Sequence, residues 1–106
     1  MSSDPRARLE TLQAEYQRRI DGIRADLQHR EQPVSADFAE QVTEGENDDV
    51  LRALLLEAES ELARVQSALQ RLARGEYGRC VRCGAGIPPA RLQALPQADT
   101  CPDCAV

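Results

Sequence analysis

The sequence is poor in aromatic residues and contains no lysine. Its 106 residues include one Phe, two Tyr and no Trp, and all 13 basic residues are Arg. The longest apolar run, from Ala53 to Leu56, is only four residues long, whereas a membrane-spanning helix needs about 20. A chain with so few large side chains also has little material for the walls of an enzyme pocket. These absences predict that the protein neither spans a membrane nor catalyses a reaction.

The chain is instead rich in small aliphatic residues and in charge. Ala and Leu together supply 27 residues, which favours thin packing of one helix on another. The net charge of −5 is concentrated in the middle of the chain, because residues 35–61 carry nine acidic residues and one Arg. An acidic segment is a poor partner for nucleic-acid phosphates. It suits a solvated helix face, a basic protein surface or a bound cation.

The N-terminus and the cysteine usage indicate the cellular compartment. No apolar stretch follows Met1, so the sequence has no signal peptide and we expect a cytoplasmic protein. All four Cys lie within the last 27 residues. In a reducing compartment they indicate a metal site or a redox role rather than disulfides.

Apolar residues spaced by three or four positions predict a long helix over residues 4–31. Asp4 followed by Pro5 is typical of the N-cap and the first position of a helix, and Pro33 ends the pattern. At about 1.5 Å per residue, this helix is a rod of roughly 40 Å. Its apolar stripe consists of Leu9, Leu12, Tyr16, Ile20, Ile23 and Leu27.

A strict alternation of four and three residues predicts a second helix with a coiled-coil seam. Gly75, which follows Arg residues in the last turn, marks its C-terminal end. Together the two helices predict an antiparallel hairpin over residues 1–75. Leu54 and Leu56 lie off the seam, where they can cover the base of the hairpin or contact another protein. The seam residues are Leu51, Leu55, Ala58, Leu62, Val65, Leu69 and Leu72.

The start of the second helix is open to two interpretations. Ser35 can cap a helix that begins early, whereas Thr43 opens a capping box that begins it later. Gly45 disfavours a continuous helix through this point. We therefore expect the second helix over about residues 43–74 and a turn over about residues 32–42.

The cysteines form a CxxC-x17-CxxC pattern, which is a strong signal for zinc. Two ligands on one tight turn and two on another give the tetrahedral sulfur site that zinc prefers. Four protein ligands close the site, so we expect one structural Zn²⁺ and no catalytic water. A pair of dithiol redox motifs is the alternative, but no thioredoxin-like pattern surrounds the cysteines. His29, the single His, is far along the chain, and we expect it on the surface. The predicted ligands are Cys80, Cys83, Cys101 and Cys104.

The segment between the cysteine pairs predicts a short helix that starts at Pro89 and ends before Pro96. Zinc would close the open end of the hairpin, with residues 76–106 as a small zinc-finger module. The predicted fold is therefore mainly α, an antiparallel two-helix coiled-coil hairpin capped by a small four-cysteine zinc finger. The residues that can pack beneath the metal are Ile87, Leu92 and Leu95.

This combination of hairpin and finger resembles the DksA/TraR family, whose members bind bacterial RNA polymerase. The match is dense and specific over residues 75–104 and looser through the coiled coil. The resemblance implies a cytoplasmic transcription regulator that acts on the polymerase without reading a DNA sequence. The residues that carry it are Tyr77, Gly78, Cys80, Cys83, Gly84, Ile87, Arg91, Leu92, Ala94, Pro96, Cys101 and Cys104.

The resemblance also implies a role for the predicted turn. Larger family members insert the hairpin into the polymerase secondary channel and place an acidic tip, with an Asp-x-Ala motif, near the active site. Asp37 and Ala39 match this motif, and Glu40 adds a charge. A carboxylate there would act on a magnesium site or hydrogen-bond to mobile catalytic elements. The alternative is that Asp37 only stabilises a helix N-terminus.

Two basic positions also match the family, and three features differ from its larger members. Arg64 and Arg91 match basic residues that contact the polymerase at the channel rim in the family, and each also fits an ordinary surface Arg. Unlike the larger members, the chain ends at Val106 without a helix after the finger and lacks a longer N-terminal part. Val34 stands where those members have a second tip acid. We therefore expect the contacts that depend on these pieces to differ.

Two other functions stay open at this stage. A zinc-stapled coiled-coil adaptor would join other proteins, or dimerise through the same seam, although we expect a monomer rather than a homodimer. A zinc-ribbon nucleic-acid binder would use Arg79, Arg82 and Arg91. Tyr77 is the one aromatic residue of the finger, however, and the acidic segment disfavours binding to nucleic acid.

Overall fold

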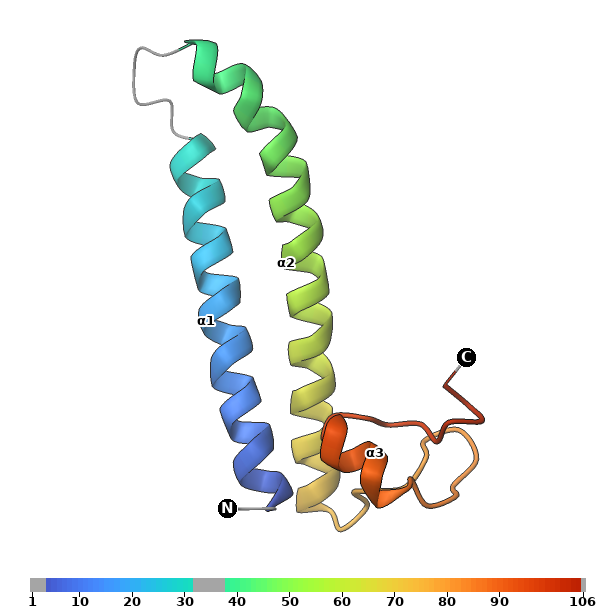
Figure 1. Ribbon diagram of the computed structural model, residues 1–106. Helices are drawn as coiled ribbons and strands as arrows, with labels where there is room; N and C mark the ends of the chain where they lie inside the picture. Colours follow the sequence, from blue (N-terminus) through green and yellow to red (C-terminus); the bar gives the residue numbers. More distant parts are fainter. Residues whose placement is uncertain (1–3, 32–37, 106) are drawn as a thin grey trace.

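The computed structural model describes residues 4–31 and 38–105, with side chains described at residues 4–28 and 48–105. The elements are α1 (Pro5–Glu31), α2 (Phe38–Ala73) and α3 (Pro89–Ala94). In Figure 1, α1 and α2 lie side by side and run in opposite directions, and the chain after α2 folds against one end of them. The predicted mainly α fold, a two-helix hairpin capped by a four-cysteine module, is therefore confirmed.

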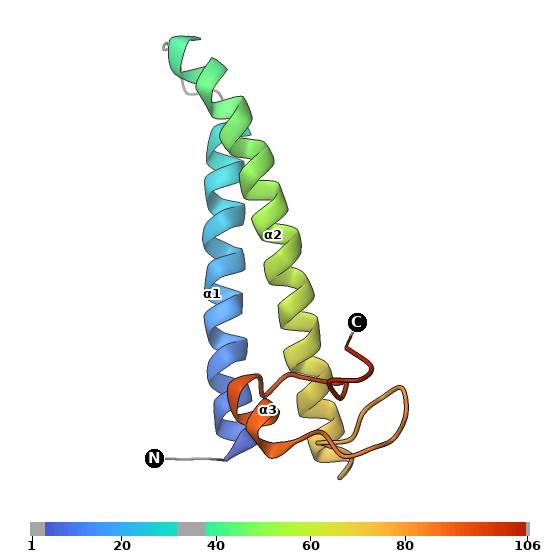
Figure 2. The ribbon, with the colours of Figure 1, turned by 45° about the vertical axis from the view of Figure 1, so that its right-hand side comes forward.

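The molecule is a rod with its cysteine module at one end. Its longest principal extent is 57 Å, against 29 and 23 Å across. The turned view in Figure 2 also places α3 and the loops around it at the end where α1 begins, opposite the end where α2 begins. The described residues contain no strand, and Arg79 and Gly86 form an isolated antiparallel bridge. None of the described helices is both long enough and apolar enough to span a membrane.

α1 begins where the sequence predicts. A side-chain oxygen of Asp4 accepts the backbone N–H of Arg6 at 3.1 Å, and the Asp4 carbonyl accepts the N–H of Arg8 at 3.2 Å. Asp4 thus satisfies N–H groups that the first turn of a helix leaves unpaired, as an N-cap residue does.

α2 begins earlier than the sequence predicts. The helix starts at Phe38 and runs continuously through Thr43 and Gly45, so the expected start near residue 43 is wrong and residues 38–42 belong to the helix. A glycine inside a helix costs only about 1 kcal/mol relative to alanine. Each further helical residue adds a backbone hydrogen bond without a new nucleation cost, so one glycine is too weak a signal to end the helix.

α2 ends at Ala73, and the predicted Gly75 forms the turn that follows it. Gly75 has φ +74°, the left-handed conformation that residues with a Cβ rarely adopt. Its N–H bonds the carbonyl of Leu72 at 3.2 Å, and the N–H of Glu76 bonds the carbonyl of Arg71 at 2.8 Å. This pair of bonds is a Schellman motif, which satisfies the last carbonyls of the helix and turns the chain toward the cysteines.

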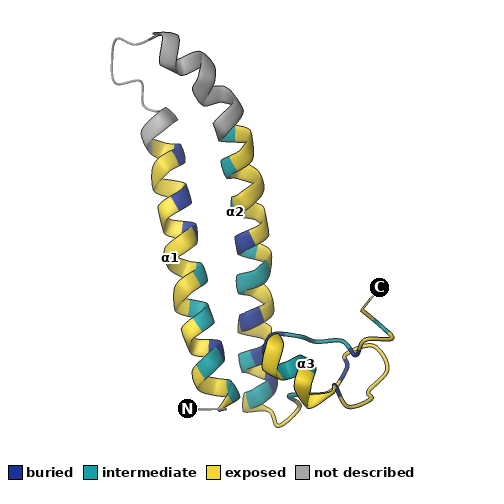
Figure 3. Cartoon of the chain, viewed as in Figure 1, coloured by how far each residue is buried: buried dark blue, intermediate teal, exposed yellow. Residues whose placement is uncertain are grey.

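The two apolar stripes face each other along the hairpin. Figure 3 shows buried residues on the facing sides of α1 and α2 and exposed residues on their outer sides. Leu9, Val65 and Ala68 form a buried cluster near the cysteine module, and Ile20 and Ala58 continue the buried seam away from it. Across this seam the Arg24 guanidinium pairs with the Glu59 carboxylate at 2.6 Å. The predicted seams therefore make the hairpin core.

The two leucines of α2 that lie off the seam do not cover the base of the hairpin. The exposed fractions are 46% for Leu54 and 69% for Leu56, and Val50 is also exposed at 58%. These side chains therefore remain on the surface of the described protein, where another molecule can contact them.

Candidate metal centre

The four cysteines come together in one cluster. Their Sγ atoms all lie within 4.8 Å of one another, and the Sγ atoms of Cys83 and Cys101 are 3.7 Å apart. Tetrahedral zinc with Zn–S bonds of about 2.3 Å requires its sulfurs to be about 3.8 Å apart. All four cysteines are free thiols rather than disulfides. The donor set and spacing fit one structural zinc with no open coordination position.

A glycine turn shapes the first cysteine pair. The Gly84 N–H bonds the Cys80 carbonyl at 2.9 Å, and the Cys80 N–H bonds the Ala85 carbonyl at 2.8 Å. Gly84 has φ +78°, which closes the turn without the strain that a side chain would add. The second pair has Ala105 in the corresponding position and is closed by a bond from the Cys104 N–H to the Cys101 carbonyl at 3.0 Å.

Two backbone hydrogen bonds tie the cysteine turns to the rest of the module. The N–H of Val81 bonds the carbonyl of Asp99 at 2.8 Å and so joins the two cysteine pairs. The N–H of Ile87 bonds the carbonyl of Gly78 at the same distance and folds the first turn back on itself. The sulfur cluster is therefore held by a backbone framework as well as by any bound metal.

The thiols of the cluster differ in acidity. Backbone hydrogen bonds, that of Cys101 first, lower the pKa of Cys80 to about 6. Hydrogen bonds with neighbouring thiols, first that of Cys101 and then that of Cys80, raise the pKa of Cys104 to about 12. One thiolate thus forms readily, while further negative charge in the cluster is disfavoured without a cation. A divalent metal would stabilise all four thiolates together.

A small apolar core lies beneath the cluster. Ile87 is 5% exposed and packs with Cys80 and Cys101, and Leu92 packs against them from α3. Leu95 was expected there as well, but it is 45% exposed. α3 ends at Ala94 and Leu95 has an extended backbone with φ −134°, so its side chain leaves the face of the helix that covers the metal site.

The module is attached to the hairpin by polar contacts that the sequence pattern did not reveal. An Arg8 guanidinium nitrogen donates to the carbonyl of Gln93. The Gln97 side-chain amide donates to the Glu61 carboxylate at 3.1 Å. These pairs are 85 and 36 residues apart in the chain, and neither belongs to a periodic apolar pattern. No signal in the sequence could have identified them, because polar contacts between distant segments leave no spacing rule.

The two predicted rim residues have different surroundings. Arg64 is on α2 with 58% of its side chain exposed, and it pairs with Glu61 one turn earlier at 3.9 Å. Arg91 is on α3, and its Nε donates to the carbonyl of Thr100 at 3.0 Å. Arg91 therefore also holds the segment of chain that leads to the second cysteine pair.

The described part of the predicted tip, at the start of α2, lies at the opposite end of the rod (Figure 1). Ala39 and Glu40 are in the first turn of α2, and their side chains lie outside the described residues. Asp37 lies outside the described residues altogether, and so does the side chain of His29 in α1. The acidic tip therefore stays a prediction.

Two family models match consecutive parts of the chain. The Prokaryotic dksA/traR C4-type zinc finger matches residues 75–106. The DnaK suppressor protein-like N-terminal domain matches residues 6–72, which covers both long helices. Together the two matches span the hairpin and the cysteine module.

Two solved structures resemble the whole chain. Transcription factor DksA2 from Pseudomonas aeruginosa is 34% identical with a TM-score of 0.80, over 92% of this chain and 74% of that one. The DnaK suppressor protein from Agrobacterium tumefaciens C58 is also 34% identical, with a TM-score of 0.65, over 99% of this chain and 94% of that one.

A sequence relative matches a shorter part of the chain. An uncharacterized protein of Aquifex aeolicus (strain VF5) is 43% identical over 44 residues. That match spans 42% of this chain and 30% of the length of that relative.

Proposed function

The chain belongs to the DksA/TraR family, and we propose that it regulates transcription by binding bacterial RNA polymerase in the cytoplasm. The observation that supports this most is the 57 Å rod with a cysteine module at one end. One end of such a rod can enter a narrow channel while the broader end stays outside. This mode of action requires no catalytic pocket and no sequence-specific contact with DNA.

We assign the end of the rod at which α2 begins to the polymerase secondary channel. In this proposal Asp37 lies at the leading end, immediately before α2, with Ala39 and Glu40 in the first helical turn. Carboxylates are favoured at a helix N-terminus because the helix dipole is positive there. A carboxylate carried to the catalytic centre would bind or compete for Mg²⁺, or hydrogen-bond to mobile catalytic elements, and so change initiation.

We assign the end of the rod that carries the zinc module to the channel rim. Arg64 has an exposed guanidinium on α2, one turn from Glu61, whose carboxylate accepts a hydrogen bond from Gln97 of the zinc module. Arg91 keeps its Nε on the Thr100 carbonyl, which fixes the direction of its guanidinium. In this proposal both contact acidic groups of the polymerase, and the bound zinc keeps the module that carries Arg91 in place.

A binding assay with core RNA polymerase tests the proposal. The zinc-loaded protein should bind, and Arg64→Ala should weaken binding by roughly three- to tenfold, as loss of a charged interface contact does. Arg18→Ala on the exposed outer face of α1 is the matched control and should bind like the wild type. Failure of the wild-type protein to bind core polymerase would refute the proposal.

The alternative is an adaptor that uses the hairpin to join other proteins or a second copy of itself. The exposed Val50 and Leu54 favour it, because they lie one turn apart on the same side of α2, outside the hairpin core. Sedimentation equilibrium tests for self-association, and a pull-down identifies other partners. A monomer across the micromolar range agrees with the polymerase proposal, whereas a stable dimer favours the adaptor.

A further inference from the structure

The two cysteine pairs differ in how much of their support is local. The segment that carries the first pair is closed on itself by three backbone hydrogen bonds between residues 78 and 87, at 2.8, 2.9 and 2.8 Å. Within residues 101–105, by contrast, the structure describes a single backbone hydrogen bond, from the Cys104 N–H to the Cys101 carbonyl. The second pair therefore depends more than the first on contacts with other parts of the module.

The contacts that support the second pair hold the two residues that precede it. The carbonyl of Asp99 accepts the backbone N–H of Val81 at 2.8 Å. The carbonyl of Thr100 accepts the Nε–H of Arg91 at 3.0 Å, in a part-buried position. Thr100 is joined directly to Cys101, so the guanidinium holds the backbone one residue away from a zinc ligand. A hydrogen bond from a charged donor is stronger than one from a neutral donor.

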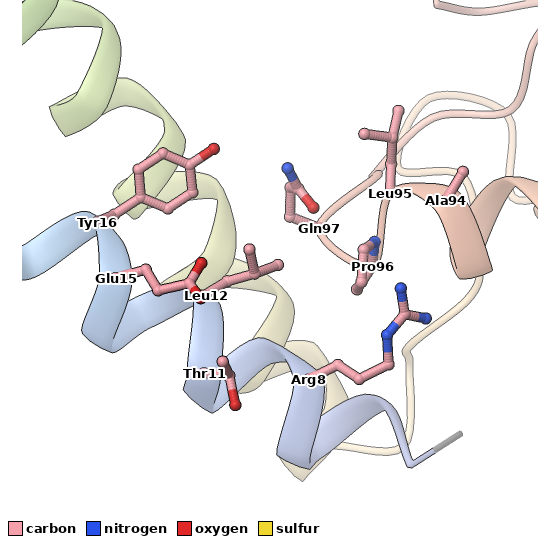
Figure 4. Close-up of a pocket in the computed structure, with 9 residues that line it drawn as sticks. All are labelled: Arg8, Thr11, Leu12, Glu15, Tyr16, Ala94, Leu95, Pro96 and Gln97. Atoms are coloured by element: carbon pink, nitrogen blue, oxygen red, sulfur yellow. The ribbon is translucent and has the colours of Figure 1, made fainter. Parts of the chain in front are cut away.

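The helix that carries Arg91 is itself anchored to the rest of the molecule. The carbonyl of Gln93 accepts a hydrogen bond from the Arg8 guanidinium, which ties α3 to α1. Figure 4 shows the Arg8 side chain extending from α1 toward the end of α3, where Ala94 lies. On another side of α3, Leu92 packs against the apolar core beneath the sulfur cluster. α3 therefore provides a fixed support from which Arg91 holds the approach to the second pair.

We propose that Arg91 is a positioning residue for the zinc site, and that the second cysteine pair is the half of the site that opens first when zinc leaves. The bond from Arg91 to Thr100 keeps Cys101 and Cys104 beside the first pair and so slows the release of the metal. Groups that orient metal ligands in this way commonly change metal affinity by 10- to 100-fold when they are removed.

This role is separate from the contact with polymerase that is proposed for the same residue. Positioning uses the Nε of Arg91, whereas a contact with an acidic group of a partner would use the terminal nitrogens of the guanidinium. The inference rests on the zinc site alone and is tested on the isolated full chain. It therefore holds or fails independently of the proposed function.

Transfer of zinc to a chromophoric chelator measures its release, at chelator concentrations on which the rate no longer depends. Arg91→Ala should release zinc about tenfold faster than the wild type. Arg82→Ala is the matched control, because it removes the same charge from between Cys80 and Cys83. The Arg82 side chain is exposed and has no hydrogen bond or ion pair among the described residues, so this variant should release zinc like the wild type. Equal rates for the two variants would overturn the inference.

A conservative substitution separates the hydrogen bond from the loss of the side chain. The ammonium group of a lysine can donate to the same carbonyl from a side chain of similar length. Arg91→Lys should therefore release zinc more slowly than Arg91→Ala. Release that is as fast from Arg91→Lys as from Arg91→Ala would overturn the assignment to the bond with Thr100.

Hydrogen exchange in the zinc-loaded protein identifies which half of the site opens. The amide of Cys104 closes the second pair, and the amide of Gly84 closes the first. Arg91→Ala should speed exchange at Cys104 by about tenfold and leave the Gly84 rate close to that of the wild type. Circular dichroism equal to that of the wild type establishes that the hairpin of the variant is folded. Equal acceleration at both amides would show that the module opens as one unit, and it would overturn the inference.

Discussion

The hydroxyl of Tyr77 donates a hydrogen bond to the carbonyl of Pro96 at 2.8 Å. The same side chain packs against the hairpin cluster that contains Leu9 and Val65. Tyr77 therefore belongs to the hairpin core through its ring and to the zinc module through its hydroxyl. This double contact joins two parts that are each too small to bury much surface alone.

Tyr77→Phe should lower the free energy of unfolding of the zinc-loaded protein by about 1 kcal/mol, because the ring stays packed and only the hydrogen bond is lost. Urea denaturation followed by circular dichroism measures the change. Tyr16→Phe is the matched control, since the hydroxyl of Tyr16 makes no hydrogen bond among the described residues. Equal losses in the two variants would contradict a role for the Tyr77 hydroxyl.

The burial of the Tyr77 phenol should also make stability depend on pH in the alkaline range. Burial raises the pKa of the Tyr77 phenol above 10.0, although Arg8 and Arg71 act in the lowering direction. The folded protein thus holds this proton more tightly than the unfolded chain does. The resulting stabilisation is fully present below pH 10.0 and is lost as the pH rises through the folded-state pKa. Tyr77→Phe should lose less stability than the wild type over that range in the same urea titrations.

Removal of zinc should release the cysteine module before the hairpin. Chelation should abolish hydrogen-exchange protection of the amides of Val81 and Ile87, whose bonds to Asp99 and Gly78 hold the module. The amide of Val65, in the buried core of the hairpin, should keep more of its protection. Unchanged protection of Val81 and Ile87 in the chelated protein would show that zinc does not hold the module.

Two glycine substitutions should change stability in opposite directions. Gly75→Ala should destabilise the protein by about 1 kcal/mol, because it places a Cβ at φ +74° in the Schellman motif. Gly22→Ala should stabilise it by roughly 0.5–1 kcal/mol, since Gly22 lies inside α1 and an added Cβ would meet nothing within 4 Å. Thermal unfolding of both variants checks the signs. Destabilisation by Gly22→Ala would contradict the expectation that helix propensity decides the effect of a substitution at this position.

The sequence predicted those parts of the fold that follow periodic or short-range rules. The apolar spacing identified both sides of the hairpin, Asp4 identified the start of α1, and Gly75 identified the end of α2. The spacing of the cysteines identified the cluster because metal ligands in two tight turns have a regular pattern. The start of α2 was placed too late because Gly45 disfavours a helix by only about 1 kcal/mol, which is too little to end one.

The attachment of the module could not be predicted in the same way. The contacts of Arg8 with Gln93 and of Gln97 with Glu61 depend on how α1, α2 and the finger meet in three dimensions. The side-chain oxygen of Gln97, which is buried without a hydrogen-bond partner among the described residues, is also invisible in the sequence, where this residue is one polar position in a short loop.

We propose that an acidic tip acts inside RNA polymerase while the zinc end holds the protein outside. The most direct measurement compares wild type, Asp37→Asn and Asp26→Asn for binding to core polymerase and for transcription initiation in vitro. Asp37→Asn should bind like the wild type but lose most of its effect on initiation. Asp26→Asn, which removes an exposed carboxylate from α1, should retain both properties. If Asp37→Asn changes initiation as much as the wild type does, the tip does not act through this carboxylate.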